Sequence, residues 1–344
     1  MKFNFIVLSF VFAFVSSCSD GPKQHEKYTV IKGKTMGSTY EIAYDSSINI
    51  QEQIDYMLGF YNYLLSTYDS SSIISKFNNN LMLTQDDSIS FYNSREIFTD
   101  LDRLSNEVYQ TTEGSFNPGI ASLINYWGFG ENKKNPESMN PKTIDSLKKL
   151  VYGFKVDFLG LHPLKLNVNQ KLNYNGIAAG QMVDLIAKTF DSIYHFKNYY
   201  INISGEIRAK GNNGSDSYWP IKIEKPMLNS HKQIAFATLP LKNYSLATSG
   251  NYRQFFFKEG KRYGHSIDPI SGYPARNEML SATILAPNAA LADAYATACM
   301  VMGLKKSIQL IESKPELKAF LIYEKDKKIE FWSSANLSFE LEKE

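Results

Sequence analysis

The chain has 344 residues, enough to bury a large hydrophobic core and near the length at which a second lobe becomes common. Its 43% hydrophobic and 14% aromatic content excludes a disordered protein, and its formal net charge of +2 excludes the strongly basic surface typical of nucleic-acid binding. We therefore expect a globular protein of one large domain or two interlocked lobes, with no nucleic acid as partner.

The N-terminus has the pattern of a bacterial lipoprotein signal. Lys2 precedes a predominantly apolar run over residues 3–15, which is too short to cross a hydrocarbon core of roughly 30 Å. The quartet VSSC, which ends at Cys18, resembles a lipobox, in which the cysteine becomes the lipidated first residue of the mature protein. The alternative is an ordinary signal peptide with an incidental cysteine. A lipidated Cys18 could not pair with Cys299, the other cysteine of the chain, so no disulfide is expected.

The rest of the chain predicts an α+β fold. Residues 19–27 read as a flexible tether and residues 28–344 as one large folded domain. Alternating apolar and polar residues on either side of Gly37 predict two strands, and helical spacing predicts helices within residues 48–69 and 93–114. The polar, proline-bearing segment 132–157 predicts an exposed excursion. Beyond it we expect a helix over about 178–196, strand-like runs up to 334 and a helix over 288–313, forming mixed, mostly antiparallel sheets with packed helices.

The last of these helices contains a candidate metal pair. Asn288 is a plausible N-cap and Gly303 a plausible C-cap, and the segment between them is apolar nearly all round, so it should be buried. Asp293 and Thr297 then lie four residues apart on one face. A buried carboxylate must be paired, hydrogen-bonded or metal-bound, and this pair offers hard oxygen ligands of the kind that Mg²⁺ accepts. A structural partner for Asp293, an arginine or a backbone amide, is the alternative.

Two glycine-bearing segments could hold other parts of a ligand. In NYNGIAAGQMVD, Gly176 and Gly180 frame the start of a helix whose first amides would suit a diphosphate. In TTEGSFNPGIASLINYWGFG, Phe116, Trp127 and Phe129 offer flat apolar surface for a planar heterocycle. Asn117 offers an amide. Each segment fits an ordinary turn packed on a core as well.

The stretch YGHSIDPISGYP contains one of only five histidines. His265 should lie on a strand that leads into the Asp268–Pro269 turn, and a histidine there could move a proton or hold a phosphate. Thr248 and Ser249 end another strand just before Gly250. Taken singly, a histidine at a strand end fits a structural role as well.

Taken together and in order, these segments resemble the FAD:protein FMN transferases, the ApbE-type flavin transferases. The resemblance covers nearly the whole mature chain, including KTMGSTY, GSFNPGI, NGIAAGQMVD, INISGEIRAKG, GHSIDPISGYP and ALADAYATACMVMG. It implies a T-fold-like α+β domain and Mg²⁺-dependent transfer of FMN from FAD, with release of AMP, to a threonine or serine of a target protein. The implied targets are flavin-accepting subunits of respiratory or redox membrane complexes. The implied location is the periplasmic side of a bacterial membrane, with the inner membrane favoured.

The resemblance also implies roles for individual residues. The metal ligands fall at the side chains of Asp293 and Thr297 and at the backbone carbonyl of Gly176. His265 stands in the family's His-x-(Ile/Leu)-Asp-Pro motif, so His265 and Asp293 are the predicted catalytic residues. The contacts to the flavin nucleotide fall at Met36, Tyr68, Ser115, Phe116, Asn117, Asn173, Ala179 and Ile267.

Some positions depart from the usual family pattern. Acidic residues are replaced by Asn117 and Asn173, a lysine by Ala179 and a glycine by Ser204. These changes predict altered nucleotide binding in a working enzyme. Two alternatives stay open, namely an FAD pyrophosphatase that yields FMN and AMP, and a flavin-binding lipoprotein without catalysis.

Overall fold

The computed structural model describes residues 28–130, 140–151, 156–158, 160, 162–165, 167–215, 217–227, 234–251, 255–258 and 261–342. The predicted signal segment, Cys18 and the tether lie outside these residues. No helix within the described ranges is both long enough and apolar enough to span a bilayer.

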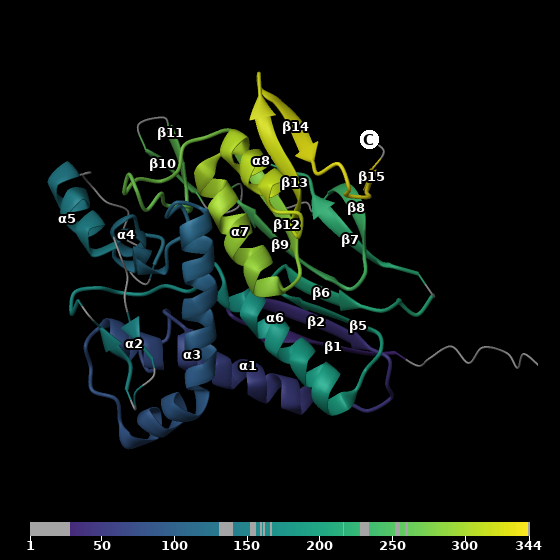
Figure 1. Ribbon diagram of the computed structural model, residues 1–344, viewed down its shortest axis with the longest axis horizontal. Helices are drawn as coiled ribbons and strands as arrows, with labels where there is room; N and C mark the ends of the chain where they lie inside the picture. The colour runs from purple at the N-terminus through teal and green to yellow at the C-terminus, as the bar shows by residue number, and fades with distance from the viewer. Residues whose placement is uncertain are drawn as a thin grey trace, which may run out of the picture.

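An eight-stranded sheet forms the centre of the fold, and all its neighbouring strands pair antiparallel (Figure 1). The predicted strands around Gly37 form its first hairpin, whose two turn residues, Met36 and Gly37, both have positive φ. In spatial order the strands are β1 (Thr29–Thr35), β2 (Ser38–Tyr44), β5 (Tyr199–Ile203), β6 (Glu206–Lys210), β9 (Tyr244–Gly250), β12 (Met279–Ala286), β13 (Lys318–Lys325) and β14 (Lys328–Ser333).

Helices cover one face of this sheet, with α6 and α7 lying across its middle strands (Figure 1). The predicted helix over 178–196 is α6, and its last part continues as a π-helical turn, η2 (Phe190–Tyr194). The helix predicted over 288–313 is divided at Gly303, where φ is +76°. The helices of this layer are α1 (Gln51–Leu65), α3 (Gln85–Thr111), α6 (Ala178–Thr189), α7 (Ala289–Met302) and α8 (Leu304–Ser313). The short helix α2 (Ile73–Asn78) packs beside α1.

A smaller sheet covers part of the opposite face. Along β13 successive side chains point to opposite sides, so Ala319 and Leu321 pack under the helices while Phe320 and Ile322 pack against this second sheet. Every residue of β12 is buried for the same reason. The second sheet consists of β7 (Trp219–Glu224), β8 (Ala235–Leu241) and β15 (Glu340–Leu341).

The polar segment 132–157, predicted to be an exposed excursion, contains a helix that packs into the molecule. Helix α5 (Pro141–Val151) buries Ile144 and Val151 in a satellite cluster with Trp127 and Ile267. The prediction was wrong here because a few apolar residues on one face are enough to anchor a helix whose other faces are charged. The remaining short elements are η1 (Pro118–Ile120), α4 (Ala121–Tyr126), the hairpin β3 (Val156–Asp157) with β4 (Leu164–Lys165), and the hairpin β10 (Phe255–Lys258) with β11 (Lys261–Gly264).

Candidate functional site

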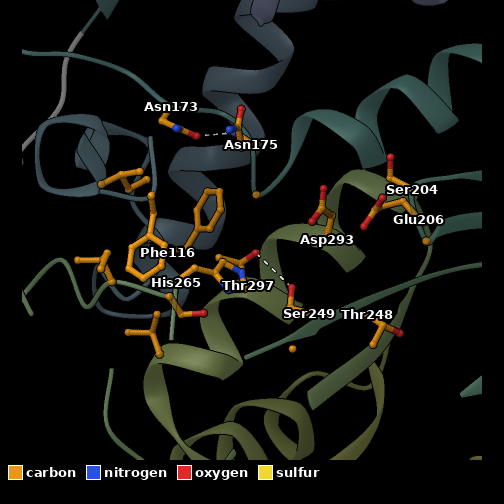
Figure 2. A pocket seen from close by; sticks show the side chains of 18 of the residues that line it. Phe116, Asn173, Asn175, Ser204, Glu206, Thr248, Ser249, His265, Asp293 and Thr297 are labelled. Atoms are coloured by element: carbon orange, nitrogen blue, oxygen red, sulfur yellow. Dashed lines mark hydrogen bonds between the residues drawn. The ribbon is translucent and has the colours of Figure 1, made fainter. Parts of the chain in front are cut away.

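A cavity of about 600 Å³ opens between the helical layer and the two sheets. This volume lies in the range of small-molecule and cofactor sites. In Figure 2 the carboxylates of Asp293 and Glu206 and the hydroxyl of Ser204 lie on one side of the cavity. The aromatic side chain of Phe116 lies on the other side. The predicted site residues that line it are Tyr68, Ser115, Phe116, Asn117, Asn173, Gly176, His265, Ile267, Asp293 and Thr297.

Helix α7 presents the predicted metal pair to this cavity. Asp293 and Thr297 lie one turn apart, and both line the cavity wall. The Asp293 carboxylate is buried, and its Oδ2 accepts the backbone N–H of Gly180 at an N···O distance of 3.3 Å. The Thr297 hydroxyl lies 3.4 Å from the Ser249 hydroxyl at the end of β9. The partner of Asp293 is therefore a backbone amide, and this long hydrogen bond leaves carboxylate lone pairs available for a cation.

The start of α6 completes the oxygen-rich end. A Cβ placed on Gly176 would lie 2.9 Å from the Thr297 hydroxyl oxygen and 3.4 Å from the Phe116 ring, so glycine lets this turn approach α7. Gly180 lies in the first turn of α6, where a Cβ would come within 2.3 Å of the Ala289 carbonyl oxygen. These glycines therefore serve close packing against α7.

Glu206 is a site residue that the sequence analysis did not select. It begins β6, lines the cavity, and has a buried Oε2 atom with no hydrogen-bond partner within the described part of the chain. Burial, and then the neighbouring Asp293 carboxylate, raise the pKa of Glu206 well above its usual range. Burial also raises the pKa of Asp293, against the lowering effect of the Gly180 amide. The only sequence signal was an acid that directly follows the turn in NISGEI.

This donor set fits a hard divalent cation. Within the described chain no group of three or more His, Cys, Asp or Glu side chains is placed to hold a metal. The candidate site instead combines the Asp293 carboxylate, the Thr297 hydroxyl, the adjoining Gly176 turn and the orphaned Glu206 oxygen. Oxygen ligands supplemented by water and phosphate are what Mg²⁺ prefers, and its charge would relieve the repulsion between two buried carboxylates.

His265 lies directly after β11, at the start of a tightly bonded turn. Its half-buried ring makes an edge contact with Phe129, with centroids 6.4 Å apart. The Asp268 carbonyl accepts the Gly272 N–H at 2.8 Å, and the Trp127 indole N–H donates to the Gly272 carbonyl at 2.8 Å. The predicted Asp268–Pro269 turn is therefore braced by the satellite cluster, to which α5 contributes.

The apolar end is built from the segment that precedes η1. Ser115, Phe116 and Asn117 are all buried. The Asn117 side chain accepts the Gly119 N–H at 2.8 Å and donates to the Val151 carbonyl at 3.1 Å. Tyr68 is 64% exposed, at the edge of the cavity. The amide at position 117 is thus satisfied by the protein itself.

The other predicted nucleotide contacts take different positions. Asn173 lines the cavity, where its Oδ1 accepts the Asn175 N–H at 2.8 Å (Figure 2). Ile267 also lines the cavity and is buried in the satellite cluster. Met36, in the β1–β2 turn, and Ala179, in the first turn of α6, do not belong to the lining residues, so their contacts stay predictions.

Comparison with known proteins shows the family of this chain. The sequence model of the ApbE family matches residues 36–321. The chain belongs to the ApbE family. The FAD:protein FMN transferase of Haemophilus influenzae is 32% identical over 316 residues, 88% of this chain and 89% of that protein. Its counterpart in Vibrio cholerae is 31% identical over 290 residues, 82% of this chain and 84% of that protein.

Solved ApbE structures share the fold. The flavin transferase ApbE of Vibrio cholerae has a TM-score of 0.75 at 27% identity, over 90% of this chain and 97% of that one. The flavinyl transferase ApbE of Pseudomonas stutzeri has the same TM-score and identity, over 90% and 95% of the two chains. The predicted α+β fold of the ApbE type is confirmed.

Proposed function

We propose that this ApbE-family chain is a Mg²⁺-dependent FAD:protein FMN transferase, which attaches FMN through a phosphoester to a threonine or serine of a target protein and releases AMP. The observation that carries the proposal is a single cavity that combines oxygen donors, carbon-rich walls and His265. A flavin ring suits the walls around Phe116 and Phe129, and a diphosphate suits the end near α7.

The chemistry is phosphoryl transfer. The acceptor hydroxyl oxygen forms a bond to the phosphorus of the FMN half, the bond from that phosphorus to the bridging oxygen breaks, and AMP leaves with that oxygen. His265 lines the cavity, and in this proposal its ring takes the hydroxyl proton or holds the phosphate. The braced turn at Asp268 fixes the backbone on which His265 stands, and such fixed geometry is what in-line transfer requires.

Asp293, Thr297 and the Gly176 carbonyl would hold Mg²⁺, with Glu206 beside them. When bound, the cation neutralises charge on the diphosphate. The oxygen-only donor set supports this assignment, as does the Glu206 oxygen, which has no hydrogen-bond partner among the residues that the structure describes. The hydrogen bond from the Gly180 N–H holds the Asp293 carboxylate at the oxygen-rich end of the cavity.

The N-terminal sequence supports the location that we propose, and the resemblance to the flavin transferases supports the partners. We propose that the mature protein is anchored through lipidated Cys18 on the periplasmic side of a bacterial membrane, more specifically the inner membrane. Its acceptors would be flavin-carrying subunits of respiratory or redox membrane complexes. The lipobox-like VSSC and the polar tether of residues 19–27 support this proposal.

Mass spectrometry of an acceptor peptide tests the function. The chain without residues 1–18 is mixed with FAD, Mg²⁺ and a threonine-bearing peptide, and one added FMN with release of AMP is expected. AMP without a modified peptide would favour an FAD pyrophosphatase. Unchanged FAD, with binding retained, would favour a non-catalytic flavin-binding protein, for which the departures at Asn117, Asn173 and Ala179 are the best support.

A further inference from the structure

Helices α6 and α7 are joined by a reciprocal exchange of carboxylates and backbone amides. Asp184 of α6 accepts the N–H groups of Ala289 and Ala290, the first two of α7, at 2.9 Å each. Asp293 of α7 accepts the N–H of Gly180, the third of α6, at 3.3 Å. Each helix therefore supplies a carboxylate to the N-terminus of the other, where the first amides have no partner within their own helix.

The spacing makes this exchange sensitive to sliding of one helix along the other. Asp184 lies four residues after Gly180, and Asp293 four residues after Ala289, so both bonds lie on the contacting faces. The helices touch there so closely that Gly180 has no room for a Cβ. Because one residue advances a helix by about 1.5 Å, a slide of one residue would break the exchange.

The candidate cation ligands lie on both sides of this contact. Gly176 precedes α6, whereas Asp293 and Thr297 belong to α7. Asp184 does not line the cavity that holds Asp293 and Thr297, and it borders instead a second hollow together with Arg208 and Asn288. Any influence of Asp184 on the cation would therefore be transmitted through α7.

We propose that Asp184 is a positioning residue that fixes α7 against α6 and so sets the spacing between the Gly176 carbonyl and the oxygen ligands Asp293 and Thr297. The inference rests on the proposed function of that site. Mg²⁺ is intolerant of distorted coordination, so loss of this positioning should weaken Mg²⁺ binding before it affects the flavin end of the cavity.

Other bonds at the start of α7 should keep Asp184 variants folded. The Asn288 side chain accepts the Leu291 N–H at 2.8 Å, and the Arg208 guanidinium donates to the Pro287 carbonyl at 2.7 Å. Asp184→Asn retains one acceptor oxygen but turns an NH₂ group toward the second amide. Asp184→Glu retains the carboxylate on a longer stem and is the milder variant.

The test measures Mg²⁺ binding by titration calorimetry and by the Mg²⁺-dependent rise in the thermal midpoint, with FAD binding followed separately in chelator by flavin fluorescence. For Asp184→Asn we expect Mg²⁺ affinity to fall by about 10- to 100-fold while FAD affinity in chelator changes less than about threefold. Asp184→Glu should show a smaller fall. Asp87→Asn, which removes a buried capping carboxylate from α3, is the matched control and should lower the thermal midpoint without changing Mg²⁺ affinity.

Parental Mg²⁺ affinity in both Asp184 variants would overturn the inference, and if Asp184→Asn does not fold, Asp184→Glu decides alone. A parent protein that binds no Mg²⁺ would overturn the cation site itself and the inference with it. An intact cation site that is unaffected by Asp184 would leave the proposed transferase function standing.

Discussion

The two ends of the cavity are built in different ways. At the oxygen-rich end the side chains stand on regular elements, with Asp293 and Thr297 on α7 and Glu206 on β6. At the other end Phe116 and His265 stand on loops. The Trp127 indole N–H holds the turn after His265, and the Asn117 side chain joins the segment of Phe116 to Val151. Cation ligands need fixed geometry, which helices and strands provide through their own backbone hydrogen bonds, whereas these loops are fixed by contacts with neighbouring segments.

This difference also separates how each end responds to substitution. A change at the oxygen-rich end should alter cation binding and turnover together, because its donors stand on elements that pack rigidly against one another. A change on the loops should alter turnover or flavin binding and leave Mg²⁺ binding intact. Four substitutions test this division, and the effect that we expect on activity decreases from the first to the last.

Asp293→Ala should have the largest effect. It removes the buried carboxylate of the cation pair, and we expect FMN transfer to fall by about 10³-fold or more, with loss of Mg²⁺ binding. Transfer is measured by mass spectrometry of the acceptor peptide. Asp293→Asn, which keeps the shape and the acceptor for Gly180, separates charge from packing and should be nearly as inactive. Full activity in Asp293→Ala would remove the metal assignment.

His265→Asn should lower kcat by roughly 10²- to 10⁴-fold if the ring moves the proton. The pH–rate profile should lose the limb that depends on this histidine, while Mg²⁺ affinity stays at the parental value. His195→Asn is a suitable control because His195 is exposed and its left-handed backbone tolerates asparagine. A profile unchanged in shape would indicate that His265 only holds a phosphate.

Asn117→Asp should mainly reduce stability. The Asn117 amide donates to the Val151 carbonyl at 3.1 Å, and a carboxylate cannot make this bond. We expect a loss of roughly 1–3 kcal/mol in the free energy of unfolding. The KM for FAD should change only slightly. Denaturant titration and initial rates measure the two quantities. Asn175→Asp, on an exposed residue of the same cavity, should cost less stability, and an Asn117→Asp protein as stable as its parent would contradict the assignment.

Asp87→Asn should leave activity unchanged, since Asp87 lies in the N-terminal cap of α3 and does not line the cavity. Burial opposes ionisation of Asp87, but hydrogen bonds from Lys76, Tyr63 and Thr84 outweigh it and hold the pKa of that carboxyl well below its usual range. Its stabilisation is therefore fully present above the unfolded pKa of about 4 and is lost as the pH falls below that value.

We expect Asp87→Asn to lose roughly 1.5–3 kcal/mol of unfolding free energy at pH 7, with a difference from the parent that shrinks between about pH 4 and pH 2. Denaturant titrations at several pH values measure this difference. A difference that is constant with pH would show that the carboxylate charge contributes nothing.

Much of the fold could be predicted from the sequence because its signals are local. Alternation predicted the β1–β2 hairpin, and helical spacing with capping residues predicted α7 from Asn288 to Gly303. The helix expected within 93–114 begins earlier, at Gln85, after a capping box formed by Thr84 and Asp87. The packing of helix α5 was missed because its few apolar residues are buried only by contact with the satellite cluster around Trp127, which lies elsewhere in the sequence.

The family, the α+β class and the residue types of the site could all be inferred from the sequence. The reason is that motifs are recognised from the order and spacing of residues alone, without the tertiary structure. The folded molecule was needed to show that Glu206 shares the cavity with Asp293, that Met36 and Ala179 lie outside its lining, and that Asp184 caps α7. These relations join residues that are far apart along the chain, and their cause is packing between elements. No periodicity or local motif encodes such contacts.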